Sequence, residues 1–167
     1  GGGPDARDLD RLCDALDNAV GSGGYARLSA DDGPTARYRA FLRVVRDEVS
    51  IVAGTRNAAF APVARLGLVA MWDDHDTAHQ EPRAPYHHAR EVLLLRATET
   101  GCAALFTSPA RSAEAERLVL TGWAREIVAD RSLLRHRAPW VRAVADDPTA
   151  AHDPHHTARI PHLAWEV

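Results

Sequence analysis

Residues 66–72 read LGLVAMW, an apolar run that ends in the polar sequence DDHD at 73–76. A similar run, VSIVA, precedes it at 49–53, and a third, CAALF, follows at 102–106. The first two runs do not alternate apolar with polar side chains, which is typical of central strands covered on both faces. Stretches with helical spacing precede the first run and lie between the second and third runs. The order predicts an α/β fold with a parallel sheet flanked by helices.

Two helices are expected before residue 49. Gly21 ends the first helix, and the second begins near Pro34, because proline is tolerated in the first turn of a helix. A short extended run, residues 25–28, lies between them. The apolar face of each helix is formed by Leu9, Leu12, Leu16 and Val20 in the first and by Tyr38, Phe41, Leu42 and Val45 in the second.

Two further helices are expected in the second half. One begins at Pro85 and extends to about Thr100, where Gly101 ends it. Ser112 is the predicted N-cap of the other, which finishes at Gly122. Residues 145–159 lack apolar periodicity and contain two prolines, so a linker is expected there.

Length and charge limit the class of protein. The 167 residues, 46% of them hydrophobic, suffice for one domain core. A net charge of −3 excludes a strongly basic protein that binds nucleic acid through bulk charge. The sequence has no apolar run of about 18 residues that would predict a membrane helix. It shows no signal peptide, so a cytoplasmic location and no membrane partner are expected.

Two residue types exclude particular sites. Cys13 and Cys102 lie far apart and form no CxxC pattern, so no structural zinc site built on cysteines is expected. All 20 cationic residues are arginine. Because a Walker A phosphate loop requires a lysine, this chain contains no such loop.

Polar residues follow each of the three predicted strands, at 54–57, 73–76 and 107–111. In open α/β sheets, ligands bind beyond the carboxyl ends of the strands. Polar residues are also typical of ordinary loops, so none of these clusters alone defines a site. Their joint order and spacing carry more information.

That order resembles the first motor lobe of superfamily 2 helicases and, more closely, the replication-restart helicases of the primosomal protein N′ family. The family pattern runs IVVGTRSALFAPF, NLGLIIVDEEHD, YHARD and GSATPS. This chain has IVAGTRNAAFAPV at 51–63, RLGLVAMWDDHD at 65–76, YHHAREVLLLRA at 86–97 and LFTSPARSAEAE at 105–116. The arginine-rich, lysine-free composition further resembles the actinobacterial branch of that family.

The resemblance implies a RecA-like (P-loop NTPase-type) parallel sheet. Residues 1–144 would be an incomplete first helicase lobe without its Walker A region. Residues 145–159 would be a linker, and residues 160–167 the start of the second lobe. An incomplete lobe predicts exposed apolar surface where an absent strand would pair.

The resemblance also implies a role in replication restart. Family members are ATP-dependent 3′–5′ DNA helicases that recognise forks, D-loops and single strands. They help to assemble the primosome and to reload the replicative helicase, so the expected partners are DNA and helicase-loading proteins. A nucleoid-associated location follows. The family's zinc-binding cysteines belong to regions outside this chain.

Departures from the family pattern predict a degenerate motor. In register, Trp72 takes the place of the magnesium-binding aspartate, and an indole has no oxygen to offer the metal. Asp73 and Asp74 replace the two glutamates that follow, and His75 is retained. ATP hydrolysis by this lobe is not expected, and whether Mg·ATP binds as a static ligand stays open. The coupling motif SAT becomes Ser108, Pro109 and Ala110.

Four residues are candidates for contact with DNA. Thr55 and Arg56 follow a predicted strand, where a guanidinium can clamp a phosphate. Arg83 and Arg90 would extend a track of phosphate contacts. Alternatively, Arg56 pairs with Asp73 or Asp76, and the other two arginines only solvate a helix face.

Two other functions remain as alternatives. The first is a metal-dependent hydrolase, because His75 and His79 at helical spacing could share one face. Its ligands would come from the cluster Asp73, Asp74, His75, Asp76 and His79. The second is a protein-interaction module without a ligand, whose anchors would be Trp72, Trp123, Trp140 and Trp165.

Overall fold

The computed structural model describes residues 4–138. The chain divides into two compact units, residues 1–124 and residues 125–167, which are described separately. The predicted linker at 145–159, the expected element at 160–167, and Trp140 and Trp165 lie outside the described residues.

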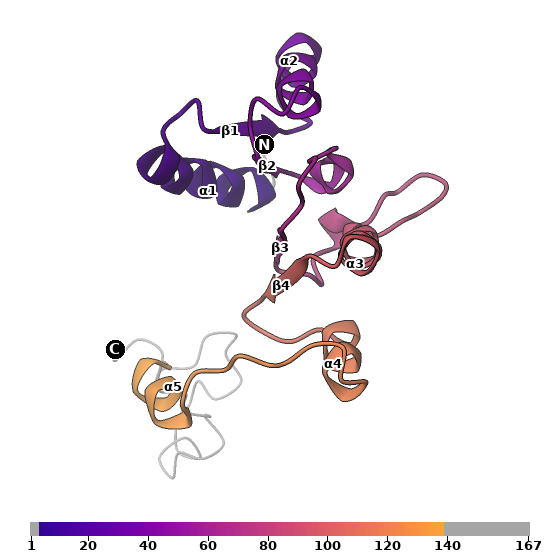
Figure 1. The fold of residues 1–167 in the computed structure, drawn as a ribbon. Coiled ribbons are helices and arrows are strands. Elements are labelled where there is room, and N and C mark those ends of the chain that lie inside the picture. The colour runs from indigo at the N-terminus through magenta and orange to yellow at the C-terminus, as the bar shows by residue number, and fades with distance from the viewer. Residues whose placement is uncertain (1–3, 139–167) are drawn as a thin grey trace, which may run out of the picture. The chain divides into compact units, whose positions relative to one another are not determined.

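The first unit begins with a helix–strand–helix–strand sequence (Figure 1). Its elements are α1 (Pro4–Val20), β1 (Tyr25–Leu28), α2 (Pro34–Val45) and β2 (Ile51–Gly54). Strands β1 and β2 are parallel, with Tyr25 opposite Ile51 and Leu28 opposite Gly54. A helical crossover between parallel strands is the connection that the sequence predicts.

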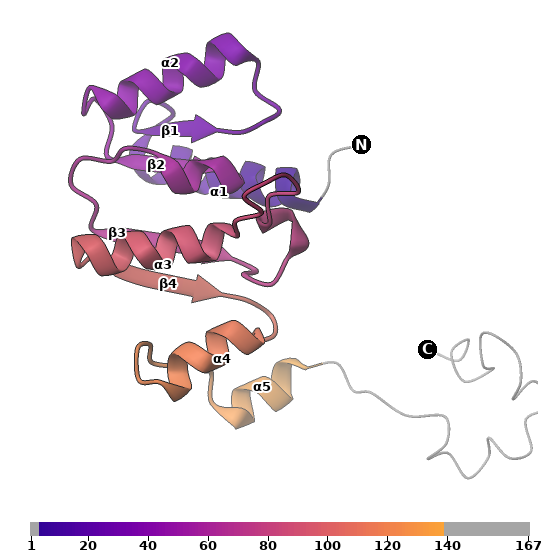
Figure 2. The same cartoon turned by 90° about the vertical axis from the view of Figure 1, so that its right-hand side faces the viewer.

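The same unit continues with a second pair of parallel strands, β3 (Leu68–Trp72) and β4 (Ala103–Thr107). Figure 2 shows the four strands one below another in chain order. Hydrogen bonding joins them into two sheets of two strands rather than one continuous sheet, which corrects the single sheet expected from the sequence. The α/β class itself is confirmed. The connecting elements are η1 (Arg56–Phe60), η2 (Thr77–His79), α3 (Ala89–Thr100) and α4 (Ala113–Leu120).

Helix α1 packs through part of the predicted face, since Leu9 is buried and Leu16 packs beside it. Leu9 and Cys13 are buried, whereas Leu12 and Val20 are exposed. Leu9 and Cys13 pack with Tyr25 of β1 and with Ala53 of β2. Because Cys13 behaves as a small hydrophobe, it completes the apolar face.

Helix α2 is turned away from the predicted orientation. Val44 is buried and Ala40 packs beside it, while Tyr38, Phe41 and Val45 are exposed. Arg43 stabilises this orientation, because its guanidinium donates to two backbone carbonyls at and just before the start of β1, Gly23 O at 2.5 Å and Tyr25 O at 3.1 Å. Ala40 and Val44 are the residues of α2 that pack in the core.

The β3–β4 sheet is covered on one face only. Val69 and Met71 pack against Leu93 and its neighbours on α3. On the opposite face Leu68 and Trp72 are each 54% exposed. The expectation that residues 66–72 are covered on both faces is therefore wrong, because no element among residues 4–124 packs there. We call this surface the open face; its apolar members are Leu68, Ala70, Trp72 and Leu105.

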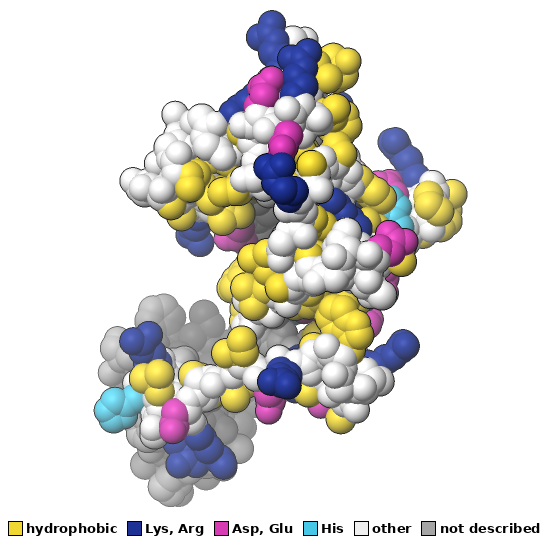
Figure 3. Space-filling model, viewed as in Figure 1, with side chains coloured by type: hydrophobic (Ala, Val, Ile, Leu, Met, Phe, Trp, Pro, Cys, Tyr) yellow, Lys and Arg dark blue, Asp and Glu magenta, His cyan; other side chains and the backbone are white. Residues whose placement is uncertain are grey.

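Figure 3 shows hydrophobic side chains at the surface around these strands. The sequence predicts exposed apolar surface where an absent strand would pair, at a sheet edge. The open face is exposed apolar surface too, but it lies on a face of the β3–β4 sheet. Apolar area of this kind on a soluble protein usually marks a contact region.

Helix α3 begins four residues later than predicted. Pro85 lies in a loop, and His88 caps the helix by accepting a hydrogen bond from Arg90 N at 3.1 Å. Gly101 has φ +70° and ends the helix in the left-handed conformation that glycine adopts at low cost. Ser112 caps α4 as predicted, by accepting from Ala115 N at 3.0 Å.

In the second unit the structure describes one helix, α5 (Arg131–Arg137). Asp130 is its N-cap, and the hydrogen bond from Ser132 N lowers the pKa of that carboxyl. Across residues 4–138, none of the helices combines the length and the apolar character needed to cross a membrane.

Replacing Met71 with alanine tests the one-sided packing of β3. We expect the free energy of unfolding to fall by about 2 to 4 kcal/mol, since a buried side chain leaves a cavity. Leu68→Ala on the same strand is the matched control and should cost less than about 1 kcal/mol. Urea unfolding followed by circular dichroism measures both. Equal losses would mean that the open face is covered in solution.

Candidate functional site

The loops after β3 and β4 meet around a buried ion pair. Asp74 is 1% exposed and Arg90 is 5% exposed. Arg90 Nη1 donates to the backbone oxygen of Asp74 at 3.0 Å and to its Oδ2 at 3.3 Å. Because a charge removed from water requires a partner, this pair fixes the loop after β3 against the first turn of α3.

The N-cap of α4, Ser112, and Glu114 in its first turn complete the network. The Ser112 hydroxyl donates to Asp74 Oδ2 at 2.5 Å while it caps α4. Glu114 Oε1 lies 3.5 Å from Arg90 Nη2. The loop after β4 is thereby tied to the loop after β3 through one carboxylate.

Arg90 is therefore not free to contact DNA. Its guanidinium is buried and engaged by Asp74, Glu91 and Glu114. The expectation that Arg90 extends a track of phosphate contacts is corrected, because its side chain is buried and already paired with carboxylates.

A second, more exposed cluster joins Asp73, His75 and Ser108. The Ser108 hydroxyl lies 3.1 Å from Asp73 Oδ1, and His75 Nδ1 lies 3.0 Å from the same oxygen. His75 Nδ1 is also the nitrogen that faces Ser108, at 3.5 Å. A catalytic relay uses opposite nitrogens of the imidazole for the nucleophile and the carboxylate. The cluster consequently links the two strand ends without forming such a relay.

The residues that replace the coupling motif, Ser108, Pro109 and Ala110, come directly after β4. Ser108 Oγ lies 2.5 Å from the backbone oxygen of Ala110, so the turn through Pro109 closes on its own hydroxyl. The serine contacts Asp73 in the β3 loop. Pro109 and Ala110 contribute no side-chain hydrogen bond, because they have no polar side-chain atom.

Trp72 ends β3 on the open face. Its indole is 54% exposed, and its backbone oxygen lies 2.9 Å from His79 Nε2. Asp73 follows with φ +53°, a left-handed conformation that turns the chain sharply after the strand. The strand end therefore presents an indole outward and the Asp73 carboxylate toward Ser108.

Arg56 holds the loop that follows η2. Its Nη1 donates to the backbone oxygens of Ala78 at 3.0 Å and Gln80 at 2.9 Å, and its Nη2 lies 3.0 Å from Glu81 Oε2. The guanidinium is thus used within the chain, which disagrees with a free phosphate clamp. The alternative pairing with an aspartate of the 73–76 cluster is also wrong, since the partner is Glu81.

Thr55 directly precedes η1 and this arginine. Thr55 N donates to Leu28 O at 3.1 Å, which brings the end of β2 against the end of β1. A Cβ at Gly54 would lie 2.2 Å from the same carbonyl, so only glycine fits there. The GTR sequence is explained by this close approach and by the clamp that Arg56 forms.

The loop at 80–88 is anchored at its base and exposed at its tip. Gln80 and His88 form an antiparallel bridge, and Glu81 N donates to His87 O at 2.8 Å. Tyr86 is 62% exposed at the tip, and Arg83 is exposed beside it. Of the four DNA candidates, Arg83 is the arginine whose side chain stays accessible.

The candidate metal ligands do not converge. Across the described range 4–138, no three His, Cys, Asp or Glu side chains gather around a possible ion position. Asp74 is taken by Arg90, Asp76 caps η2 through Ala78 N, and His79 contacts Trp72 O. Residues 77–79 form a single 3-10 turn, so His75 and His79 share no helical face. The hydrolase alternative loses its geometric basis.

The partners of several residues were not predictable from the sequence. Arg96 donates from Nη1 to Ala59 O at 2.6 Å and from Nη2 to Ala61 O at 2.8 Å, which joins α3 to η1. Ser112 was predicted as a cap but not as a partner of Asp74. No spacing in the sequence indicates either contact, because both depend on packing between distant segments.

The chain is similar to known proteins over almost its whole length. No family model matches it. It is 49% identical over 169 residues to the "Probable replication restart protein PriA" of Mycobacterium tuberculosis (strain CDC 1551 / Oshkosh), covering 97% of this chain and 25% of that protein. The protein of the same name from Mycobacterium leprae (strain TN) is 49% identical over 168 residues, with 96% and 25% covered. The "Replication restart protein PriA" of Treponema pallidum (strain Nichols) is 38% identical over 77 residues, with 46% and 12% covered.

These matches identify the chain as homologous to a segment of the replication restart proteins. The particular relative is PriA, and the resemblance predicted from the motifs is confirmed. The higher identity and coverage of the mycobacterial proteins agree with the predicted actinobacterial branch. The chain spans about a quarter of the length of the mycobacterial relatives it matches.

Arg56→Ala tests the anchor of the 80–88 loop. Loss of a charged hydrogen-bonding group that stabilises by about 1.5 to 3 kcal/mol raises the population of the open loop roughly tenfold or more. We expect trypsin to cleave after Arg83 faster by that factor, measured by mass spectrometry of timed digests. Arg65→Ala removes a 77%-exposed arginine paired with Asp47 and is the matched control. Equal cleavage rates in the two variants would contradict the anchor.

His88 should make the free energy of unfolding fall at low pH. Burial lowers the pKa of His88, and the nearby Arg90 guanidinium lowers it further. The neutral ring caps α3, so its contribution is present above the unfolded pKa of about 6.5 and is lost as pH falls through the lower folded value. We expect His88→Asn, which keeps a capping oxygen, to reduce the loss of stability below pH 6.5, measured by urea unfolding. An unchanged pH profile would contradict this assignment.

Proposed function

We propose that the chain is part of a RecA-like first lobe in a replication restart protein whose ATP motor has degenerated. The protein would recognise forked or D-loop DNA and help to assemble the primosome and reload the replicative helicase. The observation that carries the loss of the motor is Trp72, which occupies the end of β3 where a magnesium-binding carboxylate would be required. The remaining contacts at the strand ends agree with a scaffold.

The side chains around Trp72 do not fit a hydrated magnesium ion. Asp74 is buried and neutralised by Arg90, so it cannot turn toward a ligand without leaving an unpaired guanidinium. Asp73 is engaged by His75 and Ser108. One exposed indole and two carboxylates that are already engaged within the chain do not supply the oxygen ligands that Mg²⁺ needs.

The network between the strand ends supports a static role. In a motor, the loops after neighbouring strands must shift with the state of the nucleotide. Here Asp74 binds Arg90 and Ser112 at once, and Ser108 binds Asp73. These contacts hold the two loops in one arrangement, as a recognition surface requires.

The accessible arginine of the 80–88 loop supports contact with DNA. Arg83 and Tyr86 lie at the exposed tip, while Arg56 and the Gln80–His88 bridge hold the base. A cation for phosphates beside an aromatic ring for bases is the usual composition of a single-strand contact.

The open face favours a second function, a protein-interaction module. Leu68, Trp72 and Leu105 are each more than 40% exposed on neighbouring parallel strands. An apolar strip of this kind fits a protein partner better than it fits DNA, because it carries no cation. Fork binding separates the two functions, since a pure interaction module would not bind DNA.

ATP hydrolysis by the full-length protein, with and without forked DNA, tests the proposal. We expect no DNA-stimulated turnover above background, together with measurable fork binding by fluorescence anisotropy. Asp73→Asn should leave the rate unchanged, because that carboxylate serves Ser108 and His75.

Two results would contradict the proposal. DNA-stimulated turnover that disappears in Asp73→Asn would show that Asp73 serves the metal site and that the motor is active. Absence of fork binding in the unchanged protein would contradict DNA recognition and favour the interaction module.

A further inference from the structure

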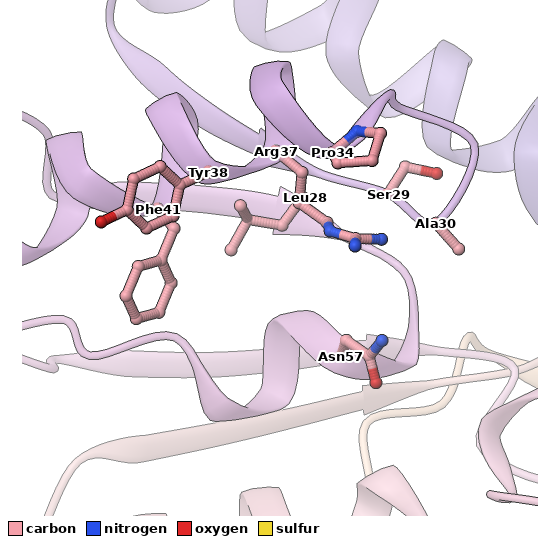
Figure 4. A pocket seen from close by; sticks show the side chains of 8 residues that line it. All are labelled: Leu28, Ser29, Ala30, Pro34, Arg37, Tyr38, Phe41 and Asn57. Carbon is pink, nitrogen blue, oxygen red and sulfur yellow. The ribbon is translucent and has the colours of Figure 1, made fainter.

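A cavity of about 480 Å³ lies beside helix α2, at the carboxyl ends of β1 and β2 (Figure 4). This volume falls in the range of about 300 to 1,000 Å³ that is typical of small-ligand sites. The cavity is separate from the Asp74 network and from the 80–88 loop. It is lined by Leu28, Ser29, Ala30, Pro34, Arg37, Tyr38, Phe41 and Asn57.

One wall of the cavity is aromatic. Tyr38 is 62% exposed and Phe41 is 38% exposed, three residues apart on α2. Neither ring is needed for packing, because the helix is held by Ala40, Val44 and the hydrogen bonds of Arg43. Two rings left outside the core at one cavity offer flat surfaces for stacking.

The charge of the lining is positive. Arg37 contributes a guanidinium, and no carboxylate lines the cavity. The nearby Asp32 is committed elsewhere, accepting from Ser29 N at 3.2 Å and pairing with Arg27 Nε at 3.5 Å. Within residues 4–138 the Arg37 guanidinium has no ion pair. The cavity is therefore complementary to an anion that carries a planar group.

The opposite side presents a free amide. Asn57 is exposed in η1, directly after β2, and Figure 4 shows its side chain facing the cavity across from α2. An amide both donates and accepts hydrogen bonds, which suits the edge of a nucleobase. The cavity is thus lined by two aromatic rings, a guanidinium and an amide, from Tyr38, Phe41, Arg37 and Asn57.

We propose that this cavity binds one unpaired base of a single-stranded nucleic acid. Tyr38 and Phe41 stack on the base, Arg37 contacts the adjoining phosphate, and Asn57 hydrogen-bonds the base edge. The inference rests on the proposed function, since it names a strand-binding subsite in a DNA-recognising lobe. A proline-rich peptide also docks on aromatic rings, but it has no charge for Arg37 to complement.

Anisotropy of a labelled oligo(dT) titrated with the full-length protein tests the stacking. Tyr38→Ser and Phe41→Ser should each weaken binding on the order of tenfold, the usual effect of removing one stacked aromatic ring. Val45→Ser is the matched control, because Val45 is 53% exposed on the same helix and does not line the cavity. Equal weakening by the control would overturn the inference.

The charge is tested by salt dependence. Arg37→Gln should lower the slope of log affinity against log salt by about one, as expected for a lost phosphate contact. Arg39→Gln, on the same helix outside the lining, should not change the slope. A slope unchanged by Arg37→Gln would overturn the role of this residue.

Photo-crosslinking locates the base directly. A strand containing 4-thiothymidine should crosslink to the peptide that contains Tyr38 and Phe41, identified by mass spectrometry. Fork binding that persists without this crosslink and without an effect of Tyr38→Ser would overturn this inference alone. Loss of all DNA binding in the unchanged protein would instead contradict the proposed function. Saturable binding of a proline-rich peptide at Tyr38, with no competition from oligo(dT), would also overturn it.

Discussion

The buried ion pair of Asp74 and Arg90 constrains the loops that follow β3 and β4. Both side chains are removed from water, so each requires the other, and the loss of either would leave a charge whose burial costs several kcal/mol. The pair fixes where α3 begins relative to β3. Through the Ser112 hydroxyl it also fixes where α4 begins relative to β4. The geometry of the strand ends follows from this one carboxylate.

Arginine performs most of the other long-range connections. Arg43, Arg56 and Arg96 each donate to two backbone carbonyls of a distant segment. A guanidinium has several donors in a rigid plane and so can bind two carbonyls at once, which a lysine ammonium does with less directional control. In a chain with no lysine, these three arginines connect segments that are distant in sequence.

The sequence predicted the parts of the fold that local chemistry decides. The parallel α/β order, the end of α3 at Gly101 and the Ser112 cap followed from apolar runs and capping residues. The packed side of α1 followed only in part and that of α2 did not, because Cys13 completes the first and Ala40 and Val44 form the second. The site was also predicted only in part. The sequence located the strand ends, but the partners of Arg56 and Arg90 lie in segments more than 15 residues away in sequence.

The one-sided sheet also affects how the chain behaves by itself. β3 and β4 present Leu68, Trp72 and Leu105 to water on one surface, and the outer edge of β4 is unpaired within the described residues. A flat apolar surface beside a free strand edge attracts further copies of the same chain. Residues 1–167 prepared as an isolated polypeptide would therefore self-associate at high concentration and bind dyes that report exposed apolar surface. Solubility, more than folding, then sets the conditions under which this segment is handled.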